Sequence, residues 1–417
     1  MPAPFSRLLV DRAPVSRAPA GYASESMPGP RILFVDHSGA LGGAELFLLD
    51  LAEPYAGRST VATFETGRFT EQLQATGISH LLVGEGGPLQ QVRKSGTWMR
   101  ALQTLPALRR TGQALARTAR RHDIIVANSQ KALLPAAWAA HQTGRPLLWM
   151  IHDLLTPDHF GLLQRQVVTR VANAAATLVG TNSRATADAF SRTGGRVDMI
   201  EIPNGLDPAA FDAARTLDTH ALRKTLGLPL RAPLIGVFSR LAAWKGQHVL
   251  LDALHMLPDA HALIVGEAAF PGDAPYADRL RAKAQSAGLQ GRVHFMGHRP
   301  DIPRLMIACD IVAHTSTAAE PFGRVVVEGL LAQRPVVATD AGGVPEIIRP
   351  QHSGLLVPPG NAAALAEACR AYMNNPDWAA KMARTGAEDV RIRYGKPRMH
   401  AQFENAVRQM TPADTSR

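Results

Sequence analysis

The strand–turn–helix segment RILFVDHSGALGGAE, at Arg31–Glu45, is the first part of the chain with a clear fold pattern. A short apolar run ends at Asp36, glycines follow, and a helical pattern begins near Gly43. This order is typical of a buried parallel strand that leads directly into a helix. Glycines at such a turn let backbone N–H groups approach a phosphate at the helix N-terminus, and the alternative is a tight turn needed only for packing. The spacing Gly-x-x-Gly-Gly differs from the dinucleotide fingerprint, which disfavours a nicotinamide oxidoreductase.

Short strand-like runs alternate with longer helical stretches through the rest of the chain, as in βαβ units with parallel sheets. The strands expected in the first half are Arg31–Asp36, Ser59–Phe64, His80–Gly84, Asp123–Asn128, Leu147–His152, Thr177–Thr181 and Met199–Ile202. After a break at Pro203–Asp207, strands are expected at Pro233–Phe238, Ala262–Val265, Arg292–Met296, Ile311–His314, Pro335–Thr339 and Leu355–Val357, and closing helices at Trp378–Arg393 and Lys396–Met410. We therefore predict two α/β domains at residues 31–205 and 206–393, followed by a terminal helical segment at 394–417. Ligands bind beyond the carboxyl ends of the strands in such sheets, so the site is expected where the two sheets face each other.

Composition agrees with two globular domains. The length of 417 residues exceeds one ordinary core, and 46% hydrophobic with 19% charged residues is an ordinary globular balance. The net charge of +10 favours anionic partners, which include nucleotides, phosphates, nucleic acid and anionic membrane surfaces, without choosing among them.

Signals of cellular location are sparse. The two cysteines, Cys309 and Cys369, match no zinc or disulfide pattern, which favours a reducing, cytoplasmic setting. The longest apolar runs fall far short of the ~18 residues that a transmembrane helix needs, so no membrane span is expected. Residues 1–30 are rich in proline, and we predict a disordered tail, with a transit peptide as the alternative and Met27 as an alternative start.

The second domain opens with the motif SRLAAWKG at Ser239–Gly246, directly after its first expected strand. Arg240 and Lys245 lie on this one loop, where both cations can reach a diphosphate. The alternative is a pair of solvated loop residues.

The segment EPFGRVVVEG at Glu320–Gly329 follows the expected strand Ile311–His314. We expect Pro321 at the first position of a helix, with free backbone N–H groups near Gly323–Val325 available to a phosphate. Glutamates at both ends of a phosphate site favour a ligand with phosphate and polyol parts, whereas the alternative is a capping Glu320 and a paired Glu328. A further turn, DAGGVPE at residues 340–346, is interpreted either as a ligand-approach site or as a simple strand–helix turn.

Together these motifs resemble glycosyltransferase family 4, the retaining group 1 glycosyltransferases with the GT-B fold. The resemblance runs from about Arg31 to beyond Arg393. It is carried by Gly-Gly-Ala-Glu at Gly42–Glu45, Asn-Gly-Leu-Asp at Asn204–Asp207, Arg-Leu…Lys-Gly at Arg240–Gly246, and Glu-x7-Glu at Glu320–Glu328. It implies two Rossmann-like domains whose parallel sheets face each other across a deep cleft, and a last helix that crosses back onto the first domain.

The resemblance also implies roles for individual residues. Among the catalytic residues that the resemblance implies, Glu320 holds the donor-sugar hydroxyls and His152 faces the donor sugar. Arg240 and Lys245 bind the leaving diphosphate and stabilise its charge. The resemblance also implies donor-binding residues. The Gly42–Gly43 turn lies beside the diphosphate, and Gly323, Arg324 and Val325 contact the donor through their backbone. Glu328 binds the ribose hydroxyls, and the loop at Gly297 and His298 lies along the base. From the residues alone, a lone histidine at the end of a strand is more often structural, and the resemblance is what favours a functional role for His152.

Retention of anomeric configuration admits a double displacement or a front-face attack. The first needs a carboxylate beneath the anomeric carbon, and no certain candidate is found, so we favour front-face attack with the departing phosphate taking the acceptor proton. No Asp-x-Asp occurs in the sequence, and we predict a metal-independent enzyme without cofactor that uses a UDP- or GDP-type sugar donor and a saccharide or lipid-linked acceptor. The alternatives are a nucleotide-sugar epimerase and an inactive nucleotide-sugar binding module.

The segment Arg93–Arg121 holds eight basic residues and no acidic one, with apolar residues at helical spacing and Pro106 expected to interrupt the helix. One interpretation is an amphipathic surface that docks on anionic lipid, which would place the protein peripherally on the inner face of the cytoplasmic membrane. The alternative is a core-facing stripe with a solvated basic back. Nucleic-acid binding is not expected, because aromatic stacking residues are not interleaved along the segment, which holds only Trp98.

Overall fold

A computed structural model describes residues 29–84 and 98–411, with only the backbone described at 98–105. The predicted tail lies outside the described residues except for its last two positions, and so do Arg93 and Lys94 of the basic segment. No helix in the described part of the chain is long and apolar enough to cross a membrane.

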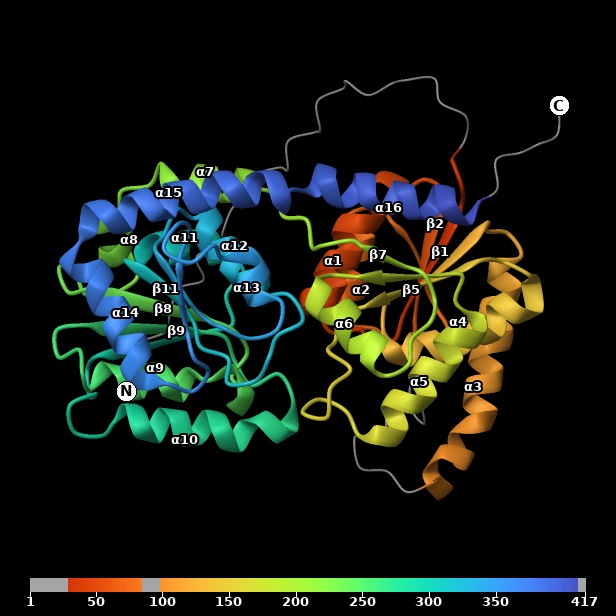
Figure 1. Ribbon diagram of the computed structural model, residues 1–417, viewed down its shortest axis with the longest axis horizontal. Coiled ribbons are helices and arrows are strands. Elements are labelled where there is room, and N and C mark those ends of the chain that lie inside the picture. The colour runs from red at the N-terminus through yellow and green to blue at the C-terminus, as the bar shows by residue number, and fades with distance from the viewer. Residues whose placement is uncertain (1–28, 85–97, 412–417) are drawn as a thin grey trace, which may run out of the picture. The chain divides into compact units, whose positions relative to one another are not determined.

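The first half contains a seven-stranded parallel sheet in the order β3-β2-β1-β4-β5-β6-β7. Its strands are β1 Ile32–Asp36, β2 Ser59–Thr63, β3 Ser79–Leu82, β4 Ile124–Ala127, β5 Leu147–Ile151, β6 Leu178–Thr181 and β7 Met199–Glu201. Its helices are α1 Gly43–Ala52, α2 Arg68–Ala75, α3 Trp98–Ala119, α4 Gln130–Thr143, α5 Leu162–Ala175 and α6 Arg184–Arg192, with a 3₁₀ turn at Glu53–Tyr55. Helices lie on both faces of this sheet (Figure 1).

The second half repeats the plan with a six-stranded parallel sheet in the order β10-β9-β8-β11-β12-β13. Its strands are β8 Leu234–Phe238, β9 His261–Val265, β10 Val293–Gly297, β11 Ile311–His314, β12 Val336–Thr339 and β13 Leu355–Val357. Its helices are α7 Ala209–Arg215, α8 Thr219–Thr225, α9 Gln247–Leu254, α10 Ala274–Ala284, α11 Ile302–Ala308, α12 Arg324–Leu331, α13 Val344–Ile347, α14 Ala362–Asn374 and α15 Pro376–Arg393, with 3₁₀ turns at Ala243–Lys245 and Pro271–Asp273. The expected fold class, α/β with two parallel-sheet Rossmann-like halves, is confirmed.

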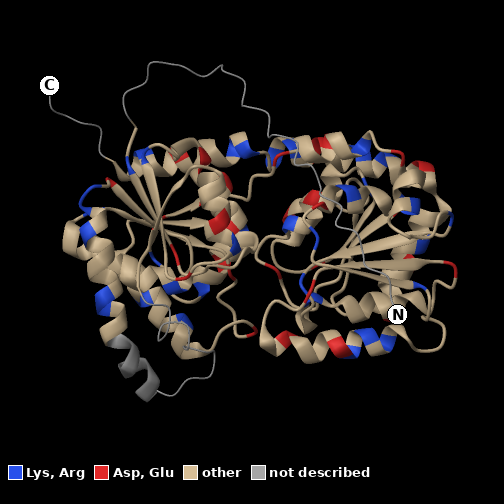
Figure 2. Cartoon of the chain, turned by 180° about the vertical axis from the view of Figure 1, so that it is seen from behind, with Lys and Arg blue, Asp and Glu red and all other residues tan. Residues whose placement is uncertain are grey.

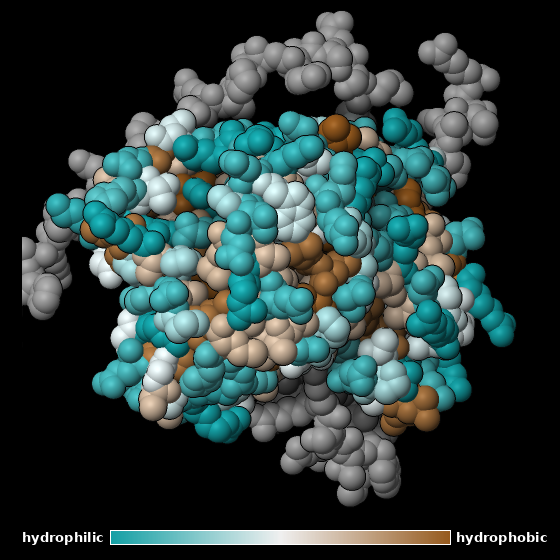
Figure 3. Space-filling view, turned by 60° about the vertical axis from the view of Figure 1, so that its left-hand side comes forward, coloured by the Kyte–Doolittle hydropathy of each residue, from teal (hydrophilic) through white to brown (hydrophobic). Residues whose placement is uncertain are grey.

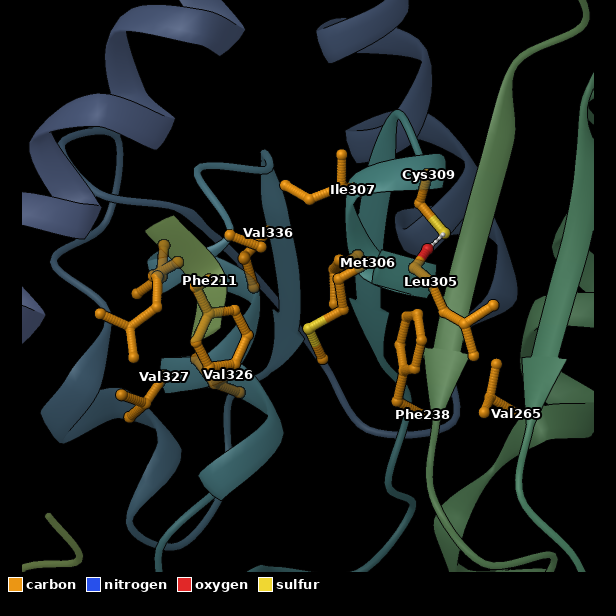
Figure 4. Packing of buried hydrophobic residues seen from close by; sticks show 14 of the residues in the cluster. Phe211, Phe238, Val265, Leu305, Met306, Ile307, Cys309, Val326, Val327 and Val336 are labelled. Carbon is orange, nitrogen blue, oxygen red and sulfur yellow. Dashed lines mark hydrogen bonds between the residues drawn. The ribbon is translucent and has the colours of Figure 1, made fainter. Parts of the chain in front are cut away.

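The central strands of each sheet are buried on both faces, whereas the edge strands β3, β7 and β10 are partly or largely exposed. In β1, Ile32 and Phe34 pack in one apolar cluster, while Leu33 and Val35 pack in another on the opposite face. This explains why the strands read as continuous apolar runs rather than as alternating ones. In the second half, Cys309 lies among the core residues of Figure 4, where its Sγ donates to the Leu305 carbonyl at 3.3 Å. Burial raises the pKa of this thiol to about 12, so it is an inert core residue.

The final helix, α16 Lys396–Met410, packs on the first half. Met399 and Phe403 belong to the same cluster as Phe34, and the Phe403 ring lies 6.0 Å from Phe34 and 5.6 Å from Tyr55, centroid to centroid. Lys396 Nζ adds an ion pair to Asp50 on α1 at 2.8 Å. The C-terminal helix therefore completes a core that begins with the first strand.

Two local predictions are wrong. Pro106 lies inside α3 and does not interrupt it, since the helix continues to Ala119. Pro321 is not the first residue of a helix, because α12 begins at Arg324, with Gly323 preceding it at φ +106°. A left-handed residue at that point starts the helix from a turn, which leaves Pro321 in the preceding loop.

Candidate active site

In a parallel sheet, ligands bind where the strand order reverses direction. That point lies between β1 and β4 in the first half and between β8 and β11 in the second. Polar side chains lie at the carboxyl ends of the strands at both switch points.

Glu320 is the centre of the polar cluster in the second half. Its Oε1 accepts hydrogen bonds from Lys245 Nζ at 2.6 Å, from His314 Nε2 at 2.8 Å and from the Ser316 hydroxyl. Burial alone would raise the pKa of this carboxyl, but Lys245 and His314 hold the pKa well below its ordinary value. Glu320 is therefore an ionised carboxylate inside the protein, and its Oε2 accepts no hydrogen bond from the described residues.

The neighbouring strands hold this cluster in place. His314 ends β11, and its Nδ1 lies 3.0 Å from the Thr339 hydroxyl at the end of β12. Because the Glu320 carboxylate can only accept, His314 Nε2 carries the hydrogen. The hydrogen bonds from Thr339 to His314 and from His314 to Glu320 therefore orient the glutamate side chain.

The turn DAGGVPE clamps the Glu320 backbone. Gly342 has a φ of +66°, and a Cβ there would lie 2.1 Å from the Glu320 carbonyl oxygen. The Gly343 N–H donates to that same oxygen at 2.8 Å. The close backbone approach at these glycines is made by the protein itself, so the turn interpretation accounts for this motif.

Trp244 brings the two cations of the SRLAAWKG motif together. The Lys245 ammonium lies 4.2 Å and the Arg240 guanidinium 5.6 Å from its ring centroid. Arg240 also lies 5.0 Å from the Phe270 centroid, and its Nη1 is 4.0 Å from Asp273 Oδ2. The structure thus places both predicted diphosphate-binding cations around one aromatic ring, with Lys245 committed to Glu320.

Glu328 lies one helical turn along α12 from Arg324. Arg324 Nε donates to Glu328 Oε1 at 2.9 Å, and its Nη1 lies 3.7 Å from Asp50 Oδ2 on α1. Burial raises the pKa of Glu328 in spite of this ion pair. Glu328 is therefore paired, as the alternative to a ligand-binding role predicted. Val325 packs against the core, and Gly323 directly precedes the helix.

In the first half, His152 directly follows β5. Its Nε2 lies 2.8 Å from Asn128 Oδ1, and its ring packs edge-on against Phe47 with centroids 4.8 Å apart. Burial lowers the pKa of this imidazole to about 4, so it is neutral near pH 7.

The predicted Gly42–Gly43 turn begins α1. Gly42 is the residue before the helix, and its N–H donates to Glu45 Oε2 at 2.9 Å. Apart from its chain neighbours and the backbone of its own helix, no atom of the described residues lies within 4 Å of the place where a Cβ would stand on Gly43, so the face of this helix start is open.

The predicted base-side loop lies apart from the Glu320 cluster. Gly297 ends β10, the edge strand, and its carbonyl accepts from the Gly266 N–H at 2.8 Å. His298 is exposed. Among the described residues, neither makes a hydrogen bond or ion pair to Glu320, and β9 separates their strand from β8.

Loops of the first half contact the residues on both sides of Glu320. His159 Nε2 lies 3.0 Å from the Ala319 carbonyl, and its ring packs edge-on to Trp244 with centroids 6.1 Å apart. The Ser183 hydroxyl donates to the Pro321 carbonyl at 2.5 Å. The two halves therefore meet at the segment that carries Glu320.

Sequence reasoning missed several residues of these clusters. They are Asp36, Asp50, Asn128, His159, Trp244 (quoted only within its motif), His314, Ser316 and Thr339. The usable signal was a polar residue at the carboxyl end of an apolar strand, as at Asp36, Asn128 and Thr339. His159 and Asp50 carry no such signal, since their roles depend on contacts between the halves.

Within the described residues, no group of three or more histidine, cysteine, aspartate and glutamate side chains is arranged to hold a metal ion.

Two parallel-sheet Rossmann-like halves, with polar clusters at both switch points, are the architecture of GT-B proteins. Two family models match the chain: a glycosyl transferase 4-like domain over residues 42–205, and the group 1 glycosyl transferases over residues 218–389. The crystal structure of Anabaena Alr3699/HepE in complex with UDP-glucose is 36% identical, with a TM-score of 0.82, over 91% of this chain and 99% of that one. The chain belongs to the group 1 glycosyltransferases of family 4.

Curated relatives are matched more partially. A phosphatidyl-myo-inositol mannosyltransferase of Mycobacterium leprae is 31% identical over 46% of this chain and 49% of its own length. A 2-deoxystreptamine glucosyltransferase of Streptomyces kanamyceticus is 29% identical over 63% of this chain and 70% of its own. The chain thus spans about half the length of the first of these relatives. Sucrose-phosphate synthase from Thermosynechococcus elongatus, at 21% identity and a TM-score of 0.75, shares the fold.

Proposed function

We propose that this protein is a retaining glycosyltransferase that moves a hexose-type sugar from a nucleoside-diphosphate donor to a saccharide or lipid-linked acceptor. The observation that carries the proposal is the buried, ionised Glu320, which faces a cation on Lys245 and keeps one oxygen without a hydrogen bond from any residue that the structure describes. A carboxylate of this kind accepts hydrogen bonds from sugar hydroxyls, and an adjacent ammonium stabilises phosphate charge. One site then serves both parts of a nucleotide-sugar.

The reaction we propose is front-face attack. The bond from the anomeric carbon to the phosphate oxygen breaks as the acceptor oxygen bonds to that carbon on the same face. The departing phosphate oxygen takes the acceptor proton, which gives the glycoside and the nucleoside diphosphate. Arg240 and Lys245 stabilise the negative charge that develops on the diphosphate, and we propose that no metal is required.

Donor contacts follow the family resemblance. Glu328 holds the ribose hydroxyls, the helix start at Gly323–Val325 and the Gly42–Gly43 turn lie beside the diphosphate, and Gly297 and His298 run along the base. A UDP-type donor is favoured by the UDP-glucose complex of the Anabaena protein, and a GDP-type donor is the alternative.

The first experiment is thermal stabilisation by UDP, GDP, ADP and NAD in the presence of EDTA. A ligand at 100 times its dissociation constant adds ~2.7 kcal/mol to the free energy of unfolding. We expect one nucleoside diphosphate to stabilise the protein, and Glu328→Ala and Arg240→Ala to abolish that effect. Exposed Glu71→Ala is the matched control. Stabilisation by NAD alone, or by no diphosphate, contradicts the proposal.

Product analysis separates the alternative functions. A transferase forms a new glycoside with the anomeric configuration of the donor, which NMR of the product shows. An epimerase returns an altered nucleotide-sugar without any acceptor, and an inactive binding module returns the donor unchanged.

We also propose a peripheral position on the inner face of the cytoplasmic membrane, through α3. Its residues Arg109, Arg110 and Arg117 are exposed, while Leu115 and Ala119 on the same helix are buried. Figure 2 shows basic residues and no acidic ones along the described part of this helix. The arrangement suits docking on anionic lipid near a lipid-linked acceptor, and the alternative interpretation of this face is a solvated basic back. The face of the second half shown in Figure 3 is mainly hydrophilic, with most of its hydrophobic residues near the middle.

A further inference from the structure

A second buried polar network lies at the strand switch point of the first half. Asp36 ends β1 and Asn128 follows β4, the neighbouring strand, and both side chains are fully buried. Asn128 Nδ2 donates to Asp36 Oδ2 at 2.6 Å and to the Ala44 carbonyl at 3.1 Å. The reaction proposed above gives neither residue a role.

The orientation of the Asn128 amide follows from its partners. Burial alone would raise the pKa of Asp36, but hydrogen bonds from His37, Asn128 and the Ser38 amide keep its pKa below the ordinary value. Asp36 is therefore ionised and can only accept, as can the Ala44 carbonyl. The group of Asn128 that faces both of them must be its NH₂, so its Oδ1 points the other way.

The tautomer of His152 follows from the amide. Asn128 Oδ1 can only accept, so His152 Nε2, 2.8 Å away, must carry the hydrogen. The other ring nitrogen, Nδ1, then bears a lone pair and makes no hydrogen bond with the described residues. Phe47 packs edge-on against the ring and restricts its rotation. The imidazole is neutral near pH 7, because burial lowers its pKa to about 4.

The family resemblance already places His152 against the donor sugar. We propose that Asp36 and Asn128 are positioning residues that hold His152 in the Nε2–H tautomer, so that Nδ1 is the atom that accepts a hydrogen bond from a sugar hydroxyl. The contact with the sugar rests on the proposed function, whereas the tautomer does not. A group that cannot donate, such as an ionised carboxylate, gains no hydrogen bond at this position. The network therefore selects a hydroxyl there rather than an acidic substituent.

The tautomer is tested by the ¹⁵N shifts of protein labelled at histidine, because protonated and unprotonated ring nitrogens have well separated shifts. Loss of one signal set in His152→Gln assigns the residue. We expect a protonated Nε2 and an unprotonated Nδ1 at pH 7. A protonated Nδ1, or a doubly protonated ring, overturns the proposal. This test needs no substitution at Asp36 or Asn128.

Asn128→Leu tests the positioning. Removal of the acceptor should give intermediate, averaged shifts for His152, because both tautomers are then populated. The matched control is Asn182→Leu: Asn182 follows β6, is also buried, and accepts from Thr186 instead of His152. Unchanged His152 shifts in Asn128→Leu, or an equal change in the control, contradict the positioning role.

The sugar contact is tested by the binding of UDP-glucose and its monodeoxy forms to the wild-type protein and to His152→Ala. One hydrogen bond corresponds to a roughly three- to tenfold change in affinity. We expect His152→Ala to weaken binding of every donor except the one that lacks the contacted hydroxyl. An equal effect on all donors overturns the contact. If the wild-type protein does not bind UDP-glucose, the favoured UDP-type donor and the contact of His152 with its sugar are both contradicted. The positioning role is then still decided by the ¹⁵N shifts.

Discussion

Lys245 Nζ lies 2.6 Å from Glu320 Oε1, so a cation from the loop after β8 and a carboxylate from the loop after β11 form one buried pair. The side chains are 17% and 10% exposed, so solvent screens the pair little. His314 and Ser316 donate to the same oxygen, which leaves the second oxygen for another donor. In the proposed function Glu320 binds the sugar and Lys245 binds the diphosphate, so this ion pair joins the residues that bind the two parts of the donor.

Loss of Lys245 should destabilise the protein through its partner. Lys245→Ala leaves a buried carboxylate without its cation, and we expect a loss of about 3 kcal/mol in the free energy of unfolding. The double variant Lys245→Ala/Glu320→Ala should lose less than the sum of the single variants, because the two residues interact directly. Urea unfolding of the three variants measures this difference, and strictly additive losses would show that the pair contributes nothing.

The Glu45 carboxyl should make stability fall as pH rises. Its pKa is raised to about 7 by burial and by the nearby charge of Asp36, compared with 4.5 for an ordinary glutamate. Between these values the folded state binds more protons than the unfolded state, so stability decreases from about pH 4.5 to 7, by about 1.4 kcal/mol for each pKa unit.

Glu45→Gln removes this titration. Relative to the wild-type protein, the variant should gain stability as pH rises from 5 to 8, on top of a constant difference from its altered bond to Gly42. Urea unfolding at several pH values checks this, with exposed Glu71→Gln as the control. Parallel curves for Glu45→Gln and wild type would refute the raised pKa.

Charge reversal on α3 should weaken membrane binding. Each basic residue near an anionic surface contributes about 1 kcal/mol, so Arg109→Glu/Arg110→Glu should reduce binding to anionic vesicles by roughly thirtyfold or more. Co-sedimentation with vesicles that contain phosphatidylglycerol measures the loss. Lys381→Glu/Arg384→Glu, on the exposed face of α15, makes the same change in net charge elsewhere. Equal binding by both variants would mean that α3 is a solvated face.

Phe403 should be a main anchor of the C-terminal helix. Its side chain is fully buried against Phe34 and Tyr55, and a buried Phe→Ala substitution costs about 3–5 kcal/mol. We expect Phe403→Ala to lower the urea midpoint strongly, while Gln409→Ala on the exposed side of α16 changes it little. A small effect at Phe403 would show that α16 is dispensable for the first-half core.

The sequence motifs predicted the site residues to different extents. Glu320 and Lys245 were predicted to serve one site, and the structure joins them directly, but as partners of each other. Glu328 was open to a ligand-binding or a paired role, and it is paired with Arg324. The domain boundaries, the donor contacts and metal independence stay predictions, because they depend on bound substrates and on the behaviour of separated parts.

The sequence by itself determined the α/β class and the two-sheet plan. Parallel strands that are buried on both faces are mainly apolar runs, and in several of them a polar residue at the end marks the carboxyl end. Ile32–Asp36 and Ile311–His314 show this directly.

Only the tertiary structure decided which of these polar ends meet. Asp36 and Asn128 are 92 residues apart, and Lys245 and Glu320 are 75 apart, yet each pair is within hydrogen-bonding distance. The reason is strand order: β1 lies beside β4 and β8 beside β11, and this order arises from crossover connections that carry no local sequence signal. The protonation of His152 and the ionisation of Glu320 follow from those contacts and not from the residues alone.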